Sequence, residues 1–159
     1  MRYLNITAPD ISNGAGCRVT LWISGCFHQC KGCHNPHTWN YEQGKYVTDE
    51  TIEEIAKWLE KPYIKGLTIS GGDPLANSIY VMGELEKFCK KIKERFPDKD
   101  IWIYTGYVYE DLREDQLKVL QYCDVLVDGP YKEELRDLTL PFRGSSNQRI
   151  IYLHKKEAE

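Results

Sequence analysis

The chain has 159 residues, of which 42% are hydrophobic and 28% charged, and its formal net charge is −3. These values fit one domain over residues 1–159 and give no global electrostatic reason to expect nucleic acid or a membrane as partner. No stretch is long and apolar enough to span a bilayer, and the first residues lack the apolar region of a signal peptide. With six cysteines and no secretion signal, we expect the chain in a reducing cytoplasm, where clustered thiols bind metals or catalyse reactions.

Apolar periodicity predicts strands that alternate with helices along the chain. The expected strands, the first of them a short edge strand, are residues 2–7, 18–23, 66–70, 101–104, 124–127 and 148–153. Four helices are expected. The first starts at Thr48, the second is capped by Asn77, the third covers residues 115–122 and the fourth is a short helix over residues 131–138. The buried stripe of the second helix is predicted to be Val81, Leu85, Phe88, Cys89 and Ile92.

Strands that alternate with helices indicate parallel βαβ units with right-handed crossovers. A complete (β/α)8 barrel takes about 250 residues, so this chain has room for about five or six strands. The sequence therefore predicts an α/β fold, in the form of a partial, open-sided (β/α) barrel.

The loop after the second expected strand carries the most informative pattern of the chain. Its cysteines are spaced Cys-x3-Cys-x2-Cys, at Cys26, Cys30 and Cys33. Thiolates are the preferred ligands of soft metal centres, above all iron–sulfur clusters and zinc. Close cysteines without a fourth partner nearby suggest a cluster with one iron left open, and an open metal position is where substrate chemistry takes place.

Unusual segments follow the other parallel strands as well. Gly71-Gly-Asp-Pro74, Tyr104-Thr-Gly-Tyr107 and Asp128-Gly-Pro130 each come directly after an expected strand. Active sites of barrel-like α/β folds lie at the C-terminal ends of the strands, so we expect one site built from several loops. The paired glycines permit close approach of a ligand to the backbone, and Asp73 can accept hydrogen bonds from an ammonium group.

The cysteine spacing resembles that of the radical S-adenosylmethionine (AdoMet) enzymes. The resemblance implies that Cys26, Cys30 and Cys33 are metal ligands and catalytic residues, each holding one iron of a [4Fe-4S] cluster. The fourth iron would take the amino and carboxylate groups of AdoMet. An electron from the cluster would then cleave AdoMet and release a 5′-deoxyadenosyl radical, and the fold implied is the partial barrel of the radical AdoMet type.

The segment after the third expected strand resembles the Gly-Gly-Glu motif with which this family holds the AdoMet amino group, with Asp73 in place of the glutamate. Gly32 stands where the commonest form of the cysteine motif has an aromatic residue. The cofactor-binding residues implied by the resemblance are Gly32, Cys33, His34, Gly72 and Asp73.

Further segments resemble one subgroup, the activating proteins of anaerobic ribonucleoside-triphosphate reductase. They cover nearly the whole chain in order and include residues 14–26, 33–39, 70–74, 101–107, 125–129 and 143–148. The resemblance implies that the deoxyadenosyl radical takes a hydrogen from one glycine of the partner reductase. The glycyl radical left there would start ribonucleotide reduction, and an open-sided barrel would let a protein loop reach the radical.

The last turns of the second expected helix are basic, with Lys87, Lys90, Lys91, Lys93 and Arg95. We favour a solvated face that complements the helix dipole. The alternative hypothesis is a docking face for an acidic electron donor such as a flavodoxin.

Other interpretations of the cysteine loop stay open at this stage. A radical AdoMet enzyme could act on another glycyl-radical enzyme or on a small molecule. A non-enzymatic zinc or electron-transfer module is the other alternative, in which a histidine completes a Cys3His site: His28, His34 or His37. The remaining thiols are expected to be small buried apolar side chains: Cys17, Cys89 and Cys123.

Overall fold

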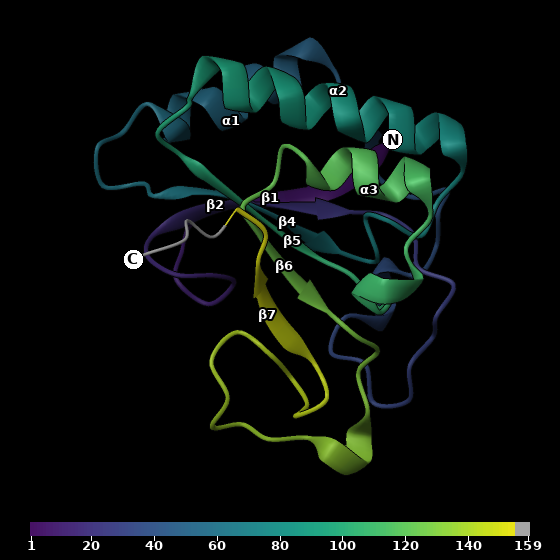
Figure 1. Ribbon diagram of the computed structural model, residues 1–159. Coiled ribbons are helices and arrows are strands. Elements are labelled where there is room, and N and C mark those ends of the chain that lie inside the picture. The colour runs from purple at the N-terminus through teal and green to yellow at the C-terminus, as the bar shows by residue number, and fades with distance from the viewer. Residues whose placement is uncertain (155–159) are drawn as a thin grey trace.

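In the computed structural model, which describes residues 1–154, three α-helices lie on one face of a seven-stranded sheet (Figure 1). The strands are β1 (Arg2–Asp10), β2 (Arg18–Ile23), β3 (Lys45–Tyr46), β4 (Gly66–Gly71), β5 (Asp100–Tyr104), β6 (Val125–Asp128) and β7 (Arg149–Tyr152). The α-helices are α1 (Asp49–Leu59), α2 (Ile79–Arg95) and α3 (Glu114–Leu120). Single turns of 3-10 helix are η1 (Pro36–Thr38), η2 (Tyr109–Asp111) and η3 (Glu133–Leu135). Among these residues, none of the helices combines the length and the apolar character that a membrane crossing requires.

The sheet has the order β3-β1-β2-β4-β5-β6-β7, so it is open, with β3 and β7 at its edges. The central strands β2, β4, β5 and β6 run parallel, which confirms the βαβ prediction, whereas β1, β3 and β7 pair antiparallel. The expected limit of five or six strands was wrong, because the two-residue β3 is too short to give a periodic signal. Since β3 pairs with Arg2 and Tyr3, the start of β1 is not an edge either.

The helix boundaries follow from local capping. Thr48 caps α1 as predicted and accepts a hydrogen bond from the Thr51 N–H. The predicted cap of α2 was wrong by one residue, because Ser78 accepts from the Val81 N–H while the Asn77 side chain accepts from Ser78 itself. Val81 is only half buried, and the fully buried stripe begins at Met82.

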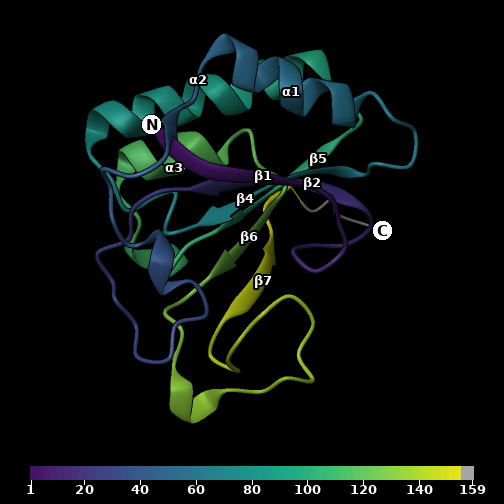
Figure 2. The same ribbon diagram turned by 180° about the vertical axis from the view of Figure 1, so that it is seen from behind.

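The short helix expected over 131–138 was also wrong. Only η3 forms there, because Arg136 turns back to pair with Ser145 as an isolated bridge. This segment belongs to the long loop between β6 and β7, which lies away from the helices in both views (Figures 1 and 2). The cysteine loop after β2 also lies on the far side of the sheet from the helical layer. The two loops therefore border the part of the sheet that helices leave uncovered.

Side chains alternate between the two faces of the sheet along the central strands, so that one face is apolar and the other is partly polar. Leu21 of β2, Ile69 of β4 and Ile103 of β5 are fully buried in the core beneath the helices. On the opposite face, Thr20 and Thr68 are buried as well. Both faces are thus covered over the central strands, but only one of them is purely apolar.

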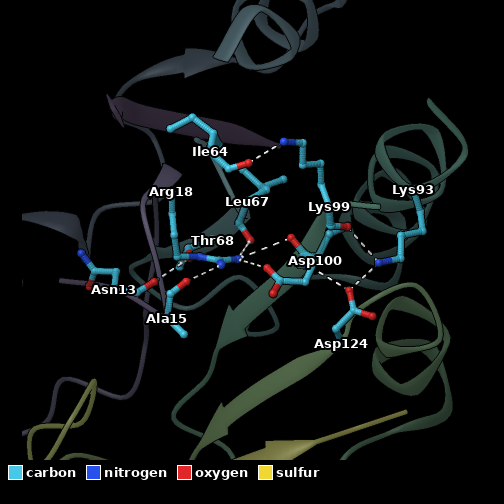
Figure 3. Close-up of polar contacts among 11 residues, drawn as sticks. Asn13, Ala15, Arg18, Ile64, Leu67, Thr68, Lys93, Lys99, Asp100 and Asp124 are labelled. Atoms are coloured by element: carbon cyan, nitrogen blue, oxygen red, sulfur yellow. Dashed lines mark hydrogen bonds and ion pairs between the residues drawn. The ribbon is translucent and has the colours of Figure 1, made fainter. Parts of the chain in front are cut away.

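A buried guanidinium joins the N-terminal ends of the central strands (Figure 3). Arg18, at the start of β2, is 0% exposed and donates hydrogen bonds to Thr68 Oγ1 (2.7 Å), the Ala15 carbonyl (2.9 Å) and the Leu67 carbonyl (2.9 Å). Its Nη2 lies 2.6 Å from Asp100 Oδ1, at the start of β5, as an ion pair. Since each terminal nitrogen has a partner, the charge is compensated inside the protein.

The same end of the sheet holds a second cation network, which ties α2 to β5 and β6 (Figure 3). Lys93 Nζ lies 2.5 Å from Asp124 Oδ2, which also accepts from the Ile101 N–H at 2.8 Å. Lys93 also donates to the Lys99 carbonyl, and Lys99 Nζ donates to the Ile64 carbonyl. The polar groups at this edge are therefore used to hold the fold together.

Replacing Arg18 by Met should lower the free energy of unfolding by roughly 3–5 kcal/mol, because Asp100 loses its counter-charge and buried carbonyls lose their donor. Arg18→Lys, which keeps the charge but not the fork of donors, should lose less. Urea unfolding of the metal-free protein measures both, with Lys31→Met as control, since the Lys31 side chain is 92% exposed. A loss no larger than the ~0.5 kcal/mol typical of surface positions would contradict the role of Arg18.

Candidate metal centre

Parallel pairing brings the ends of β2, β4, β5 and β6 to one edge of the sheet, where their loops bond to one another. The Gly72 N–H donates to the Ile23 carbonyl and the Asp73 N–H to the Gly25 carbonyl, each at 2.8 Å. The segments that follow these four strands therefore lie at one end of the parallel strands, which is the arrangement expected of a site built from several loops.

Glycine is required where the loops after β2 and β4 touch. Gly71 has φ +109°, and a Cβ on Gly72 would lie 2.2 Å from the Gly25 carbonyl oxygen. A Cβ on Gly25, which has φ +105°, would in turn overlap the Tyr41 ring. The paired glycines were predicted to let a ligand approach the backbone. In the structure, they let the loop after β4 pack closely against the loop after β2.

Cys26, Cys30 and Cys33 are half-buried free thiols of one loop. The loop closes on itself through the Cys33 N–H, which donates to the Cys30 carbonyl at 3.0 Å, and Gly32 between them has φ +76°. Backbone N–H groups also point at the sulfurs, as the Asn35 N–H does at 3.4 Å from Cys33 Sγ. Sulfurs that accept backbone hydrogen bonds are typical of iron–sulfur ligands.

Burial raises the pKa of the Cys26 thiol from its ordinary 9.0 to about 11, although the His28 and Gln29 N–H groups favour the thiolate. Burial likewise raises the pKa of Cys30. In the metal-free protein these sulfurs are therefore protonated near neutral pH, and a metal that binds them must displace their protons.

The Asp73 carboxylate lies at the centre of the strand ends and is only 1% exposed. It accepts hydrogen bonds from the Leu75 N–H (2.9 Å), the Gly106 N–H (2.8 Å) and Thr105 Oγ1 (2.9 Å). His28 Nε2, from the cysteine loop, lies 2.6 Å from Asp73 Oδ2. The predicted cofactor residue Asp73 is thus in the site, with its side chain bonded to other parts of the protein.

The histidines of the cysteine loop lie in different surroundings. The His28 ring packs against Phe27 and Tyr107, with centroids 4.7 and 4.8 Å apart. The His34 ring packs on Tyr131, 5.1 Å away. Neither ring is held against a cysteine sulfur by a contact among the described residues.

A cavity of about 370 Å³ opens beside the cysteine loop, on the face of the sheet without helices. The predicted residues Cys33 and His34 line it, together with Tyr104, Arg143 and Gln148. Arg143 Nε is buried without a hydrogen-bond partner among residues 1–154. Arg143 belongs to the segment 143–148 that the resemblance includes, but no role was assigned to it from the sequence, because it stands in an irregular loop without periodicity.

The thiols outside the cysteine loop do not take part in the site. Cys89 and Cys123 are fully buried in the apolar core, as expected. Cys17 precedes β2 and therefore lies at the opposite end of that strand from Cys26. The candidates for binding a metal are therefore the three half-buried thiols of the cysteine loop.

The donor set fits an iron–sulfur cluster. In the described part of the chain, no three His, Cys, Asp or Glu side chains are gathered around a point that could hold one metal ion. A [4Fe-4S] cluster takes each cysteine on a separate iron and needs no such convergence. Thiols from one loop, backbone N–H groups directed at sulfur and an adjoining cavity are compatible with such a cluster.

The thiol of Cys26 should stay protonated well into the alkaline range when no metal is bound. We expect its alkylation by iodoacetamide to accelerate about tenfold per pH unit up to roughly pH 10, because only the thiolate reacts and burial raises its pKa to about 11. Peptide mass spectrometry of anaerobic, metal-free protein measures this, with the thiol of a short unstructured peptide as reference. A plateau near pH 9, as in the reference, would contradict the shifted pKa.

Comparisons with known proteins agree with this geometry. A family model described as "4Fe-4S single cluster domain" matches residues 12–151. The chain is 46% identical to the anaerobic ribonucleoside-triphosphate reductase-activating protein of Enterobacteria phage T4, over 94% of this chain and 93% of the relative. The proteins of the same name from Haemophilus influenzae and Escherichia coli K12 are 43% and 39% identical, over 94% and 96% of this chain and 97% and 99% of the relatives. The chain belongs to the family of anaerobic ribonucleoside-triphosphate reductase-activating proteins.

Proposed function

We propose that this protein activates an anaerobic ribonucleoside-triphosphate reductase by generating a glycyl radical on it. The observation that carries the proposal is the loop of Cys26, Cys30 and Cys33 at the shared end of parallel strands, beside an open cavity. The names of relatives that match nearly the full chain support the same partner. A [4Fe-4S] cluster with AdoMet supplies, when bound, a 5′-deoxyadenosyl radical able to take a hydrogen atom from glycine.

The residues of this chain bind and orient the cofactors. Cys26, Cys30 and Cys33 hold the cluster, and their half-buried positions limit the access of water to it. The predicted AdoMet residues lie in two groups on facing loops: Gly32, Cys33 and His34 on the cysteine loop, and Gly72 and Asp73 after β4. After β4 we assign the contact to the backbone, because the Asp73 carboxylate already accepts bonds from other parts of the protein. Cys33 and His34 line the 370 Å³ cavity together with Ser70 of β4 and Tyr104 of β5, which supports an AdoMet site on this side of the loop.

We further propose that the sheet acts as a partial barrel of the radical AdoMet type, formed by one domain over residues 1–159. A single sheet runs through the described chain, and all three α-helices cover the same face of it (Figures 1 and 2). Its other face carries the cavity and the two long loops. A glycine-bearing loop of the reductase would approach from that side.

The electron donor that we propose is a small acidic protein of the flavodoxin kind, in a reducing cytoplasm. The basic residues of α2 give this docking little support, because they already have acidic neighbours. Lys91 lies 3.9 Å from Asp49, Lys93 is paired with Asp124, and Arg95 with Glu53. Reversing the charge of Lys93 would therefore disturb the fold, so it is a poor probe of donor docking.

The proposal is tested by cofactor cleavage and radical transfer. Anaerobically reconstituted, chemically reduced protein supplied with AdoMet and the anaerobic reductase should release 5′-deoxyadenosine and give the reductase the EPR signal of a glycyl radical. AdoMet cleavage without a radical on the reductase would favour another glycyl-radical enzyme or a small-molecule substrate. A colourless protein that retains zinc would contradict the proposal.

Replacing Cys30 by Ala should abolish both products, because the cluster loses one of its three ligands, while the fold survives because Cys30 lies in a loop outside the apolar core. Circular dichroism checks the fold, and liquid chromatography measures 5′-deoxyadenosine. Cys89→Ala, which removes a buried thiol far from the loop, serves as control and should keep the cluster. Normal AdoMet cleavage by Cys30→Ala would overturn the assignment of the ligands.

A further inference from the structure

We propose that Asp73 is a positioning residue: through His28 it fixes the cysteine loop to the strand ends, and its carboxylate is not a ligand of AdoMet. The inference rests on the proposed cluster at Cys26, Cys30 and Cys33, and gives a specific task to two side chains of the site. It also leaves the contact of this segment with AdoMet to the backbone at Gly72.

The first argument is the capacity of the carboxylate. An ionised carboxylate offers about four acceptor positions. Oδ1 accepts from the Leu75 N–H and Thr105 Oγ1, and Oδ2 accepts from the Gly106 N–H and lies 2.6 Å from His28 Nε2. Since a carboxylate only accepts, Nε2 is the donor of this last bond. An ammonium group of AdoMet could reach the carboxylate only by displacing one of these partners.

The second argument is where the donors come from. Leu75 follows β4, Thr105 and Gly106 follow β5, and His28 belongs to the loop after β2. One carboxylate thus joins three strand ends. Because Asp73 is 1% exposed, the bonds form in a medium of low dielectric, where they are strong and where an unpaired partner is costly.

The third argument is the position of His28 in the cysteine loop. It stands between Cys26 and Cys30, next to Gln29, whose φ of 48° is unusual for a residue with a side chain. Its side chain bonds to Asp73, which follows β4, and so joins the middle of the cysteine loop to the end of that strand. A loop with a strained backbone requires such support from its surroundings to keep one conformation.

The fourth argument is that the neighbours of His28 leave room for its ring. A Cβ on Gly106 would lie 2.8 Å from His28 Cδ2, so glycine at this position lets the ring approach the end of β5. Tyr107 packs edge-on against the same ring, with centroids 4.8 Å apart. The ring is therefore held both by hydrogen bonding and by packing.

The first test compares how fast loaded protein loses iron to an excess of a coloured ferrous chelator under anaerobic conditions. Asp73→Asn and His28→Leu should each lose iron about tenfold faster or more, as is typical when a residue that supports metal ligands is removed. The double variant should lose iron no faster than the faster of the two single variants, because both changes remove the same hydrogen bond between His28 and Asp73. His28→Gln, whose amide can donate to Asp73, should restore most of the slow release.

Asp128→Asn is the matched control for general destabilisation. Asp128 is also a strand-end carboxylate with 1% exposure, but its partners are Arg149 and the Tyr109 N–H, neither of which belongs to the cysteine loop. This variant should release iron at the native rate. Equal acceleration by Asp128→Asn, a native rate in Asp73→Asn, or additive effects of Asp73→Asn and His28→Leu would each overturn the proposal.

AdoMet binding separates a positioning carboxylate from a direct ligand. The change in the EPR spectrum of the reduced cluster on adding AdoMet should still occur in Asp73→Asn, at saturating AdoMet and for the fraction of protein that retains its cluster. Unchanged iron release together with loss of that spectral change would identify the carboxylate as an AdoMet ligand and refute our inference.

Amide hydrogen exchange of the metal-free protein tests the tie without any cofactor. Residues 26–33 should exchange faster in Asp73→Asn and in His28→Leu than in the native chain, while residues 101–104 of β5 should be unchanged. If the native protein took up no cluster, the proposed function would fail. This experiment would still show whether the bond between His28 and Asp73 holds the cysteine loop in place. If residues 26–33 exchanged at the native rate in both variants, the positioning role of Asp73 and His28 would be refuted, while the proposed function would be unaffected.

Discussion

The parallel pairing of β2, β4, β5 and β6 is the constraint on which the other features depend. The strands align Val19 with Leu67 and Leu67 with Ile101, so their N-terminal ends lie at one edge and their C-terminal ends at the other. Loops that are more than 20 residues apart in sequence must then meet. The cysteine loop, the paired glycines and the segment from Thr105 form one site only because this pairing brings them together.

Polar groups have different roles at the two ends of the parallel strands. At the N-terminal edge, Arg18 and Lys93 have carboxylate partners and carbonyl acceptors, so the polar groups there are satisfied by the protein itself. At the C-terminal edge, free thiols and the buried Arg143 Nε adjoin a cavity. Groups that retain bonding capacity can bind a cofactor, and this difference confines the chemistry to the C-terminal edge.

Much of the fold was predictable because its signals are local. Alternation of apolar residues marked the central strands, Thr48 marked the start of α1, and the cysteine spacing marked the site. What could not be predicted depends on contacts between distant segments. The two residues of β3 form a strand only because β1 lies beside them, and the segment 131–138 stays irregular because Arg136 pairs with Ser145.

The same limit applied within the site. Spacing alone identified Cys26, Cys30 and Cys33, but not the bond between His28 and Asp73, which are 45 residues apart. Nor did it single out Arg143, whose place beside the cavity depends on the path of the loop between β6 and β7. Residue type and spacing indicated which chemistry to expect, and the tertiary fold decided which groups remain available for it.

The identity of residue 73 agrees with a positioning role. An aspartate is short enough to accept a hydrogen bond from the backbone N–H two residues further on, and Asp73 does so with Leu75. Asp10 and Asp137 form the same local bond with Ser12 and Thr139, so the bond is a general property of an aspartate at such a turn. The longer side chain of a glutamate would move the carboxylate outward, away from this N–H and toward the neighbouring loop. Aspartate thus keeps the charge inside the turn, where it can join the strand ends and orient His28.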